Sequence, residues 1–373
     1  MAVALKLIYN ETFFEHLIGG FAKVNSNFSI KEWNKRLYTE DWENMELKER
    51  MRHIAITMHS FLDPDFKVNH KELLTLFKYV QQSETMNNLG FELMFFPDFI
   101  EVYGLNDFKE SVVCMEEITK KSSCEFAVRP FLKKYPTKML DQMKTWSTHD
   151  HAMVRRLATE GCRPRLPWAM ALEDYKKDPN PILSILEQLK NDESESVRRS
   201  VANNINDIAK DHPELVCDLL ENWKGYNNHV DWVVKHGART LLKQGNTRMM
   251  TLFGYCSLDC VEVSELNVIS KEVVFGNPLE FEVKLKNLSS EKIKIRLEYG
   301  IYFLKANGSL SRKVFKWSER EWQKGECNIL NKKHMLKAIS TRKYYSGSQE
   351  VSLIINGVEV HKKSFELLNV KNK

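Results

Sequence analysis

The sequence lacks the long apolar segments that place a protein in a membrane. Among its 373 residues no apolar run is long enough to cross a bilayer, and the most apolar segment, FELMFFPDFI at residues 91–100, is interrupted by charged residues and Pro97. The N-terminus also lacks the charged, apolar and small-residue order of a secretory signal peptide. We therefore expect a cytoplasmic protein that does not associate with membranes.

Cysteine is scarce, and the residue patterns of several catalytic classes are missing. Seven cysteines, an odd number in a chain of this length, indicate reduced thiols, and Cys256 and Cys260 have no second ligand pair nearby for zinc. The sequence contains no Gly-rich phosphate loop, no H-E-x-x-H zinc motif, no nucleophile elbow and no zinc deaminase signature. Any chemistry must therefore come from carboxylates, and we predict no metal site.

Aspartate is absent from residues 261–373, so the charge of the chain is unevenly distributed. This segment holds 21 Lys and Arg against 13 Glu, a net charge of +8, whereas residues 1–260 carry −3. Eleven of the basic residues lie between residues 305 and 343. A basic module on a near-neutral body favours a polyanion such as nucleic acid as the partner. The alternative is that these charges only solvate the surface of a β-domain.

The hydrophobic pattern changes near residue 260. Before it, apolar residues recur at helical spacing, as in residues 29–37, 71–80, 183–190 and 215–223. After it, alternating segments predict strands at residues 279–288, 293–304, 350–357 and 358–368, and Asn356-Gly357 predicts a hairpin turn between the last two. We therefore predict a multidomain α-then-β protein, with a helical domain over residues 1–258, including a cap over 1–120, and an immunoglobulin-like β-sandwich over 262–373.

The helical part contains an internal repeat. Residues 154–162 (VRRLATEGC), 197–205 (VRRSVANNI) and 233–241 (VVKHGARTL) align with spacings of 43 and 36 residues, which are typical of HEAT-like repeats. The aligned basic residues Arg156, Arg199 and Lys235 should form a stripe on one concave face of an α-solenoid. The alternative is that each pairs with an acidic neighbour.

Residues 146–168 (WSTHDHAMVRRLATEGCRPRLPW) combine a carboxylate, four arginines and an aromatic side chain. Glu160 and Trp168 lie within this segment, and Asp207 lies one helical turn beyond the repeat equivalent of Glu160, so both carboxylates can face one surface. Carboxylates stabilise positive charge, and a tryptophan ring can stack on a base. Alternatively, the carboxylates only hold the arginines in place. His149 and His151 are interpreted as turn and cap residues.

The two repeat blocks, HDHAMVRRLATEG-x-RPRLPW and RRSVANNINDIAKDHP, resemble those of the AlkC-type, HEAT-like-repeat glycosylases of DNA alkylation repair. The resemblance covers residues 100–255, and Trp168, eight residues after Glu160, is its most specific feature. Some members of this family also carry a C-terminal immunoglobulin-like domain, which agrees with the change near residue 260.

The resemblance implies hydrolysis of the N-glycosidic bond of cationic methylated bases, N3-methylcytosine and N1-methyladenine, in double-stranded DNA. It implies catalytic roles for Glu160, Asp207 and Glu125, a contact of Trp168 with the lesion, and a position near the DNA backbone for Arg156. It gives no reason to expect a metal or organic cofactor, and it favours a monomer associated with the nucleoid in the bacterial cytosol.

Two other functions stay open at the level of sequence. One is excision of N3- or N7-alkylpurines, as in the related AlkD-like branch, and the other is a non-catalytic HEAT-repeat scaffold that binds nucleic acid or protein. In each case that involves DNA, Arg199 and Lys235 would contact the duplex. We further expect the β-domain to clamp DNA through backbone contacts from Lys313, Lys316, Lys332 and Lys333.

Overall fold

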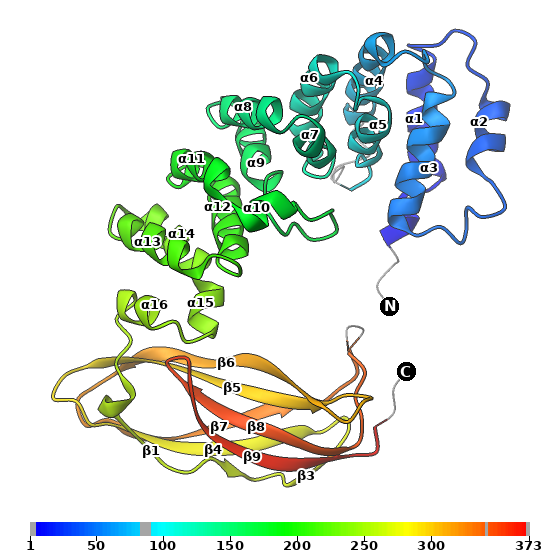
Figure 1. The fold of residues 1–373 in the computed structure, drawn as a ribbon. Helices are drawn as coiled ribbons and strands as arrows, with labels where there is room; N and C mark the ends of the chain where they lie inside the picture. Colours follow the sequence, from blue (N-terminus) through cyan, green and yellow to red (C-terminus); the bar gives the residue numbers. More distant parts are fainter. Residues whose placement is uncertain (1–4, 83–90, 340–341, 371–373) are drawn as a thin grey trace. The chain divides into compact units, whose positions relative to one another are not determined.

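A computed structural model describes residues 5–82, 91–339 and 342–370 of the chain (Figure 1). The contacts between residues divide it into two compact units. The first comprises Met1–His212 and Trp223–Gly237, and the second comprises Pro213–Asn222 and Ala238–Lys373. No helix in the described part of the chain is long and apolar enough to cross a membrane.

The first unit is helical. After a short 3-10 helix at Leu5–Ile8, its α-helices are α1 (Glu11–Phe21), α2 (Ile30–Leu37), α3 (Leu47–His59), α4 (Phe66–Gln81), α5 (Phe95–Tyr103), α6 (Phe108–Thr119), α7 (Val128–Lys134), α8 (Pro136–Trp146), α9 (Ala152–Glu160), α10 (Glu173–Lys177), α11 (Asn180–Leu189), α12 (Glu195–Ile208) and α14 (Asn228–Gly237). The predicted amphipathic segments 29–37, 71–80 and 183–190 are confirmed as parts of α2, α4 and α11.

Polar N-caps start several of the N-terminal helices. The side chains of Asn10, Ser29 and Asp65 accept hydrogen bonds from backbone N–H groups in the first turns of α1, α2 and α4, which satisfies donors that would otherwise have no partner. The apolar faces of these helices meet in an aromatic core, in which the fully buried rings of Phe21 and Trp33 lie 5.1 Å apart. α1–α6 lie within residues 1–120, the segment for which we predict a helical cap.

The repeat helices form two layers. α9, α12 and α14 pack side by side, and α8 and α11 pack behind α9 and α12. Of the aligned segments, 154–162 covers most of α9 and the two residues after it, and 197–205 lies within α12. The third aligned segment, residues 233–241, spans the last turn of α14 and the residues that follow Gly237. At Gly237 a Cβ atom would lie 3.0 Å from Ile205, so glycine allows α14 to approach α12 closely.

The second unit combines short helices with a β-sandwich. Its helices are most of α13 (Pro213–Trp223), α15 (Arg239–Lys243) and α16 (Thr247–Leu252), followed by a 3-10 turn at Leu258–Cys260. The predicted segment 215–223 is confirmed as part of α13. Arg248 on α16 forms ion pairs with Glu214, Asp218 and Glu221 on α13, at 2.9, 2.6 and 2.6 Å.

The sandwich consists of two sheets. Its strands are β1 (Val261–Val263), β2 (Asn267–Val268), β3 (Glu272–Val274), β4 (Pro278–Asn287), β5 (Ile293–Leu304), β6 (Leu310–Trp322), β7 (Cys327–Met335), β8 (Gly347–Ile355) and β9 (Val358–Leu368). In one sheet β4 pairs with β1 and β2 along one edge and with β7 along the other. The other sheet has the order β3-β9-β8-β5-β6, and only its β3–β9 pair is parallel.

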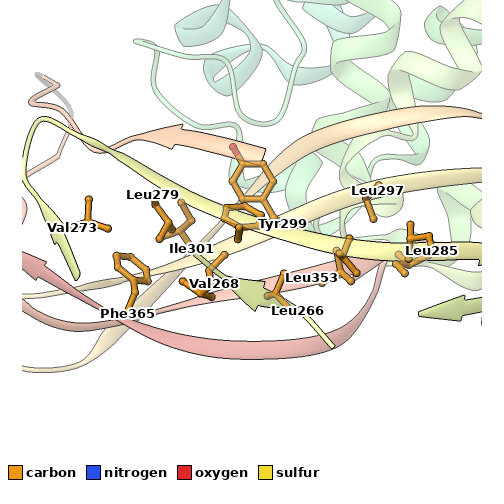
Figure 2. Close-up of a cluster of buried hydrophobic side chains, with 14 of the residues drawn as sticks. Leu266, Val268, Val273, Leu279, Leu285, Leu297, Tyr299, Ile301, Leu353 and Phe365 are labelled. Atoms are coloured by element: carbon orange, nitrogen blue, oxygen red, sulfur yellow. The ribbon is translucent and has the colours of Figure 1, made fainter. Parts of the chain in front are cut away.

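Alternation of apolar side chains builds the core between the sheets. Along β4 every second residue is buried, and Leu279 and Leu285 belong to the same core cluster as Leu297 and Ile301 from β5 (Figure 2). The predicted strands are confirmed as β4, β5, β8 and β9. The predicted hairpin is also confirmed, because Asn356 and Gly357 have φ angles of 48° and 80°. The chain thus has the predicted helical and immunoglobulin-like parts.

Candidate functional site

Two carboxylates from neighbouring repeat helices share one arginine. Glu160 ends α9, Asp207 lies in the last turn of α12, and Arg163 follows α9 by less than one turn. Nη1 of Arg163 lies 2.6 Å from Oε1 of Glu160, and its Nε lies 2.9 Å from Oδ2 of Asp207. The predicted proximity of Glu160 and Asp207 is therefore present in the structure, and Arg163 bridges them.

Further donors fix the orientation of both carboxylates. The hydroxyl of Ser200 donates to Oε2 of Glu160 at 2.5 Å, and the hydroxyl of Thr159 donates to Ser200 at 2.5 Å. Nζ of Lys210 lies 3.2 Å from Oδ1 of Asp207. Each oxygen of the two carboxylates therefore accepts from a donor, which fixes the orientation of both groups.

Glu125 extends the same network. It lies before α7, and its Oε2 lies 2.9 Å from Nη1 of Arg156 and accepts from the Ser123 hydroxyl at 2.8 Å. Nη2 of Arg156 lies 3.7 Å from Oε1 of Glu160. We call Glu125, Arg156, Glu160, Arg163, Asp207 and Lys210 the charged row. Its three carboxylates and three cations alternate, so its formal charges balance.

Burial strengthens the electrostatic interactions within the charged row. Glu160 is 4% exposed and Asp207 is 2% exposed. Burial alone would lower the pKa of Arg163, but the nearby charges of Glu160 and Asp207 outweigh it, and the pKa of Arg163 is raised. Water screens buried charges poorly. Each of these carboxylates should therefore interact with an approaching charge more strongly than an exposed carboxylate would.

A buried arginine supports the loop that follows α9. Arg129, on α7, is 0% exposed and donates to the carbonyls of Gly161 at 3.0 Å, Arg163 at 2.9 Å and Met170 at 2.7 Å. Burial lowers the pKa of Arg129 to about 10. These three bonds fix the backbone on both sides of Trp168.

Trp168 projects from this loop. It is 60% exposed, so the possibility that it is a core residue is excluded. Its φ angle of 66° lies in the left-handed region, which is uncommon for a residue with a side chain. Nζ of Lys48, on α3, donates to the carbonyl of Trp168 at 2.6 Å. A flat apolar ring is thereby presented to solvent five residues after Arg163 of the charged row.

A cavity of about 710 Å³ adjoins this region. Ser123 and Phe126, which flank Glu125, line it, as does Lys48. Most of its remaining surface comes from α3 and α5, where Arg52 pairs with Asp98 at 2.5 Å.

The predicted basic stripe has a mixed outcome. Arg156, Arg199 and Lys235 lie on α9, α12 and α14, the three helices that pack side by side. Arg156 is engaged within the charged row, and Arg199 forms an ion pair with Glu195 on its own helix. Acidic partners, the alternative considered for such residues, are therefore present for Arg156 and Arg199.

Two histidines before α9 have the structural roles that the sequence indicates. Nδ1 of His151 accepts from the backbone N–H of Met153 as the N-cap of α9, and Nδ1 of His149 accepts from the N–H of His151. Across the described ranges, no group of three or more His, Cys, Asp or Glu side chains is arranged to hold a metal ion.

The four predicted lysines of the β-domain lie on β6 and β7. Nζ of Lys316 is 2.9 Å from Glu319 and that of Lys333 is 2.7 Å from Glu280, so both are in ion pairs. The ammonium groups of Lys313 and Lys332 lie over the rings of Phe315 and Tyr299, at 5.5 and 5.6 Å.

A basic cavity of about 410 Å³ lies in the same domain. Five cationic side chains line it, together with aromatic and small residues: Lys305, Arg312, Lys313, Arg342 and Lys343. Nearby, Nδ1 of His334 lies 2.9 Å from the Tyr299 hydroxyl. Burial, followed by the positive charges of Arg342, Lys332 and Lys313, lowers the pKa of His334 to about 4.

Sequence reasoning missed several parts of this site. Arg163 was recognised only as a member of a basic cluster, although its position three residues after Glu160 could have indicated the pair. No sequence signal indicated Lys48, which is 120 residues from Trp168. The basic cavity was also missed, because its residues come from separate segments.

Comparisons with known proteins agree with this architecture. Residues 118–245 match the family described as DNA alkylation repair enzyme, and residues 262–369 match the C-terminal immunoglobulin-like domain of YhaZ. The chain is 40% identical over 353 residues to the uncharacterised protein YhaZ of Bacillus subtilis (strain 168), covering 95% of this chain and 96% of that protein. It also resembles a solved structure, the Pseudomonas fluorescens alkylpurine DNA glycosylase AlkC bound to DNA containing an abasic site analogue. In that case the TM-score is 0.91 and the identity is 33%, over 98% of this chain and 100% of the other.

Proposed function

Because this chain belongs to the AlkC-like family of DNA alkylation repair enzymes with a C-terminal immunoglobulin-like domain, we propose that it hydrolyses the N-glycosidic bond of cationic alkylated bases in duplex DNA. The observation that carries the proposal is the pair of buried carboxylates, Glu160 and Asp207, joined by Arg163, which begins the loop that exposes the ring of Trp168. In this proposal the preferred substrates of the protein are N3-methylcytosine and N1-methyladenine.

The chemistry of these lesions suits a site that is rich in carboxylates. A base that already carries a positive charge is a good leaving group, so its departure needs no strong general acid. As the bond breaks, positive charge develops on the sugar, and a nearby carboxylate stabilises that charge and can orient water towards it. In this proposal Glu160 and Asp207 stabilise the sugar, and Glu125 assists as the third carboxylate.

Trp168 and Arg156 contribute to binding in this proposal. The face of an indole ring attracts a cation by roughly 0.5–2 kcal/mol, which favours an alkylated base over a neutral one. The exposure of Trp168 leaves its ring available for such a contact. Arg156 lies between Glu125 and Glu160, where it keeps both carboxylates in place and can approach the DNA backbone.

The β-domain supplies a second region for binding DNA. Lys313 both belongs to the predicted lysine set and lines the basic cavity. We place the strongest phosphate contacts at this cavity, because Lys316 and Lys333 already have carboxylate partners. On the helical part, Arg199 and Lys235 remain candidates for backbone contacts.

One observation favours a second candidate substrate class. The structural relative from Pseudomonas fluorescens is named an alkylpurine DNA glycosylase. N3- and N7-alkylpurines are also cationic, so the same carboxylates and ring could serve them.

Base release from defined DNA tests the proposal. Duplexes with a single N3-methylcytosine or N1-methyladenine, and duplex DNA treated with a methylating agent, would be incubated with excess enzyme and the released bases identified by chromatography. We expect release of the first two bases, and loss of release in Glu160→Gln. Glu173→Gln is a matched control, because Glu173 pairs with Lys176 at the surface. Release of N3- or N7-alkylpurines alone would favour the second class, and DNA binding without release of any base would refute glycosylase activity.

A further inference from the structure

Trp168 occupies a conformation that its own residue type does not favour. Its φ angle of 66° is left-handed, and its side chain is 60% exposed, so packing of the ring in a core does not hold it there. Arg129 anchors the loop at Arg163 and Met170, but the carbonyl of Trp168 itself accepts from Lys48 at 2.6 Å.

Lys48 comes from a distant part of the first unit. It lies in the first turn of α3, 120 residues before Trp168, and is exposed. Its ammonium also lies 5.0 Å from the centroid of the Phe126 ring, and Phe126 directly follows Glu125. One ammonium group therefore contacts both the Trp168 loop and the segment that carries Glu125.

We propose that Lys48 is a positioning residue that fixes the Trp168 ring relative to the carboxylates of the charged row. The bond from a charged donor stabilises the left-handed backbone of Trp168, and the cation–π contact with Phe126 keeps the donor in place. Lys48 thereby links the N-terminal helices to the ring that receives the lesion. The role in catalysis rests on the proposed function, whereas the effect on the ring does not.

The first test observes the ring directly. The full-length protein would be labelled with 5-fluorotryptophan, its eight tryptophans observed by ¹⁹F NMR, and the Trp168 signal assigned from its loss in Trp168→Phe. We expect Lys48→Met to shift or broaden the Trp168 signal and Lys48→Arg to restore it partly, since a guanidinium can donate the same bond. Lys31→Met, at an exposed lysine on α2, is the matched control. An unchanged Trp168 signal in Lys48→Met would overturn the proposal, whether or not the protein excises bases.

The second test is a double-mutant cycle on base release. Lys48→Met should slow single-turnover excision roughly tenfold, as expected for the loss of one hydrogen bond from a charged group. In a Trp168→Ala background the same change should have little further effect, because the ring that Lys48 positions is gone. If the two effects multiply, Lys48 acts independently of Trp168 and is not its positioning residue. Absence of excision by the parent protein would refute the proposed function and leave the NMR result to decide the role of Lys48.

Discussion

Replacing Asp207 by asparagine separates a chemical role of the carboxylate from a structural one. Asparagine keeps the shape and an oxygen that can accept from Arg163, but it removes the negative charge. Arg163 would retain Glu160 at 2.6 Å, so its buried charge would still have a partner. We therefore expect the free energy of unfolding to fall by only about 1.5–3 kcal/mol, the value of a hydrogen bond to a charged group.

The effect on chemistry should be larger. Removing one preorganised group that stabilises developing charge typically slows a reaction about 10²–10³-fold. If Asp207 stabilises the sugar cation, Asp207→Asn should show this loss in single-turnover base release at saturating enzyme. Affinity for duplex DNA should be unchanged or slightly higher, since one negative charge is removed near the phosphates.

Asp211 provides a matched control four residues further along the chain. It pairs with Arg165 at 2.6 Å, an arrangement similar to that of Asp207 and Arg163, but this pair is at the surface. Asp211→Asn should change stability by less than about 1 kcal/mol and leave the rate unaltered. Thermal unfolding, DNA affinity and single-turnover rates would be measured for both variants. A rate for folded Asp207→Asn within about threefold of the parent would refute the carboxylate mechanism at this position.

Three further results are expected. Trp168→Ala should slow release of cationic bases by roughly 2- to 30-fold with almost no change in melting temperature, because the ring is exposed; a large fall in melting temperature would contradict this. Lys313→Gln combined with Arg342→Gln should lower the slope of log Kd against log salt concentration by about two units. Lys324→Gln, in an exposed turn, should leave this slope unchanged. Equal slopes for the parent and the double variant would argue against phosphate contacts at the basic cavity. The pKa of His334 is lowered to about 4 in the folded protein, whereas an unfolded chain protonates histidine near pH 6.5. The stabilisation from neutral His334 should thus be complete above about pH 6.5 and decline as the pH falls towards 4. In His334→Asn the urea unfolding midpoint should therefore depend less on pH over this range. Parallel pH profiles of the parent and the variant would show that His334 is not responsible.

The elements predicted from sequence are those whose apolar residues recur with a regular period. β4, β5, α9 and α12 each alternate or repeat their apolar residues with the period of their structure, so they could be located within a few residues. β6 and β7 could not, because they lie at sheet edges and, apart from Trp322, none of their residues is buried, so no buried apolar face marks them in the sequence.

The candidate site could be predicted only in part, for a similar reason. Glu160 and Trp168 lie in one short motif, and the repeat alignment connected Asp207 to them. Arg163 could not be identified as a shared partner, because the sequence does not indicate how far apart α9 and α12 pack. Lys48, in the first turn of α3, donates to the carbonyl of Trp168 across 120 residues of sequence, a contact that no local pattern describes.

The division of the chain between its two compact units has a consequence for exchanging modules between relatives. The chain crosses between the units three times, near residues 212, 222 and 237, so no single cut separates them. The short helices of the second unit depend on the sandwich: Asn356 donates to the carbonyl of Cys256 at 2.7 Å, and a Cβ on Gly245 would lie 2.5 Å from the carbonyl oxygen of Gly357. A gene truncated after residue 260 would therefore encode an incomplete second unit with exposed apolar surface. The smallest transferable C-terminal piece begins at residue 213 and must include α14, which belongs to the first unit.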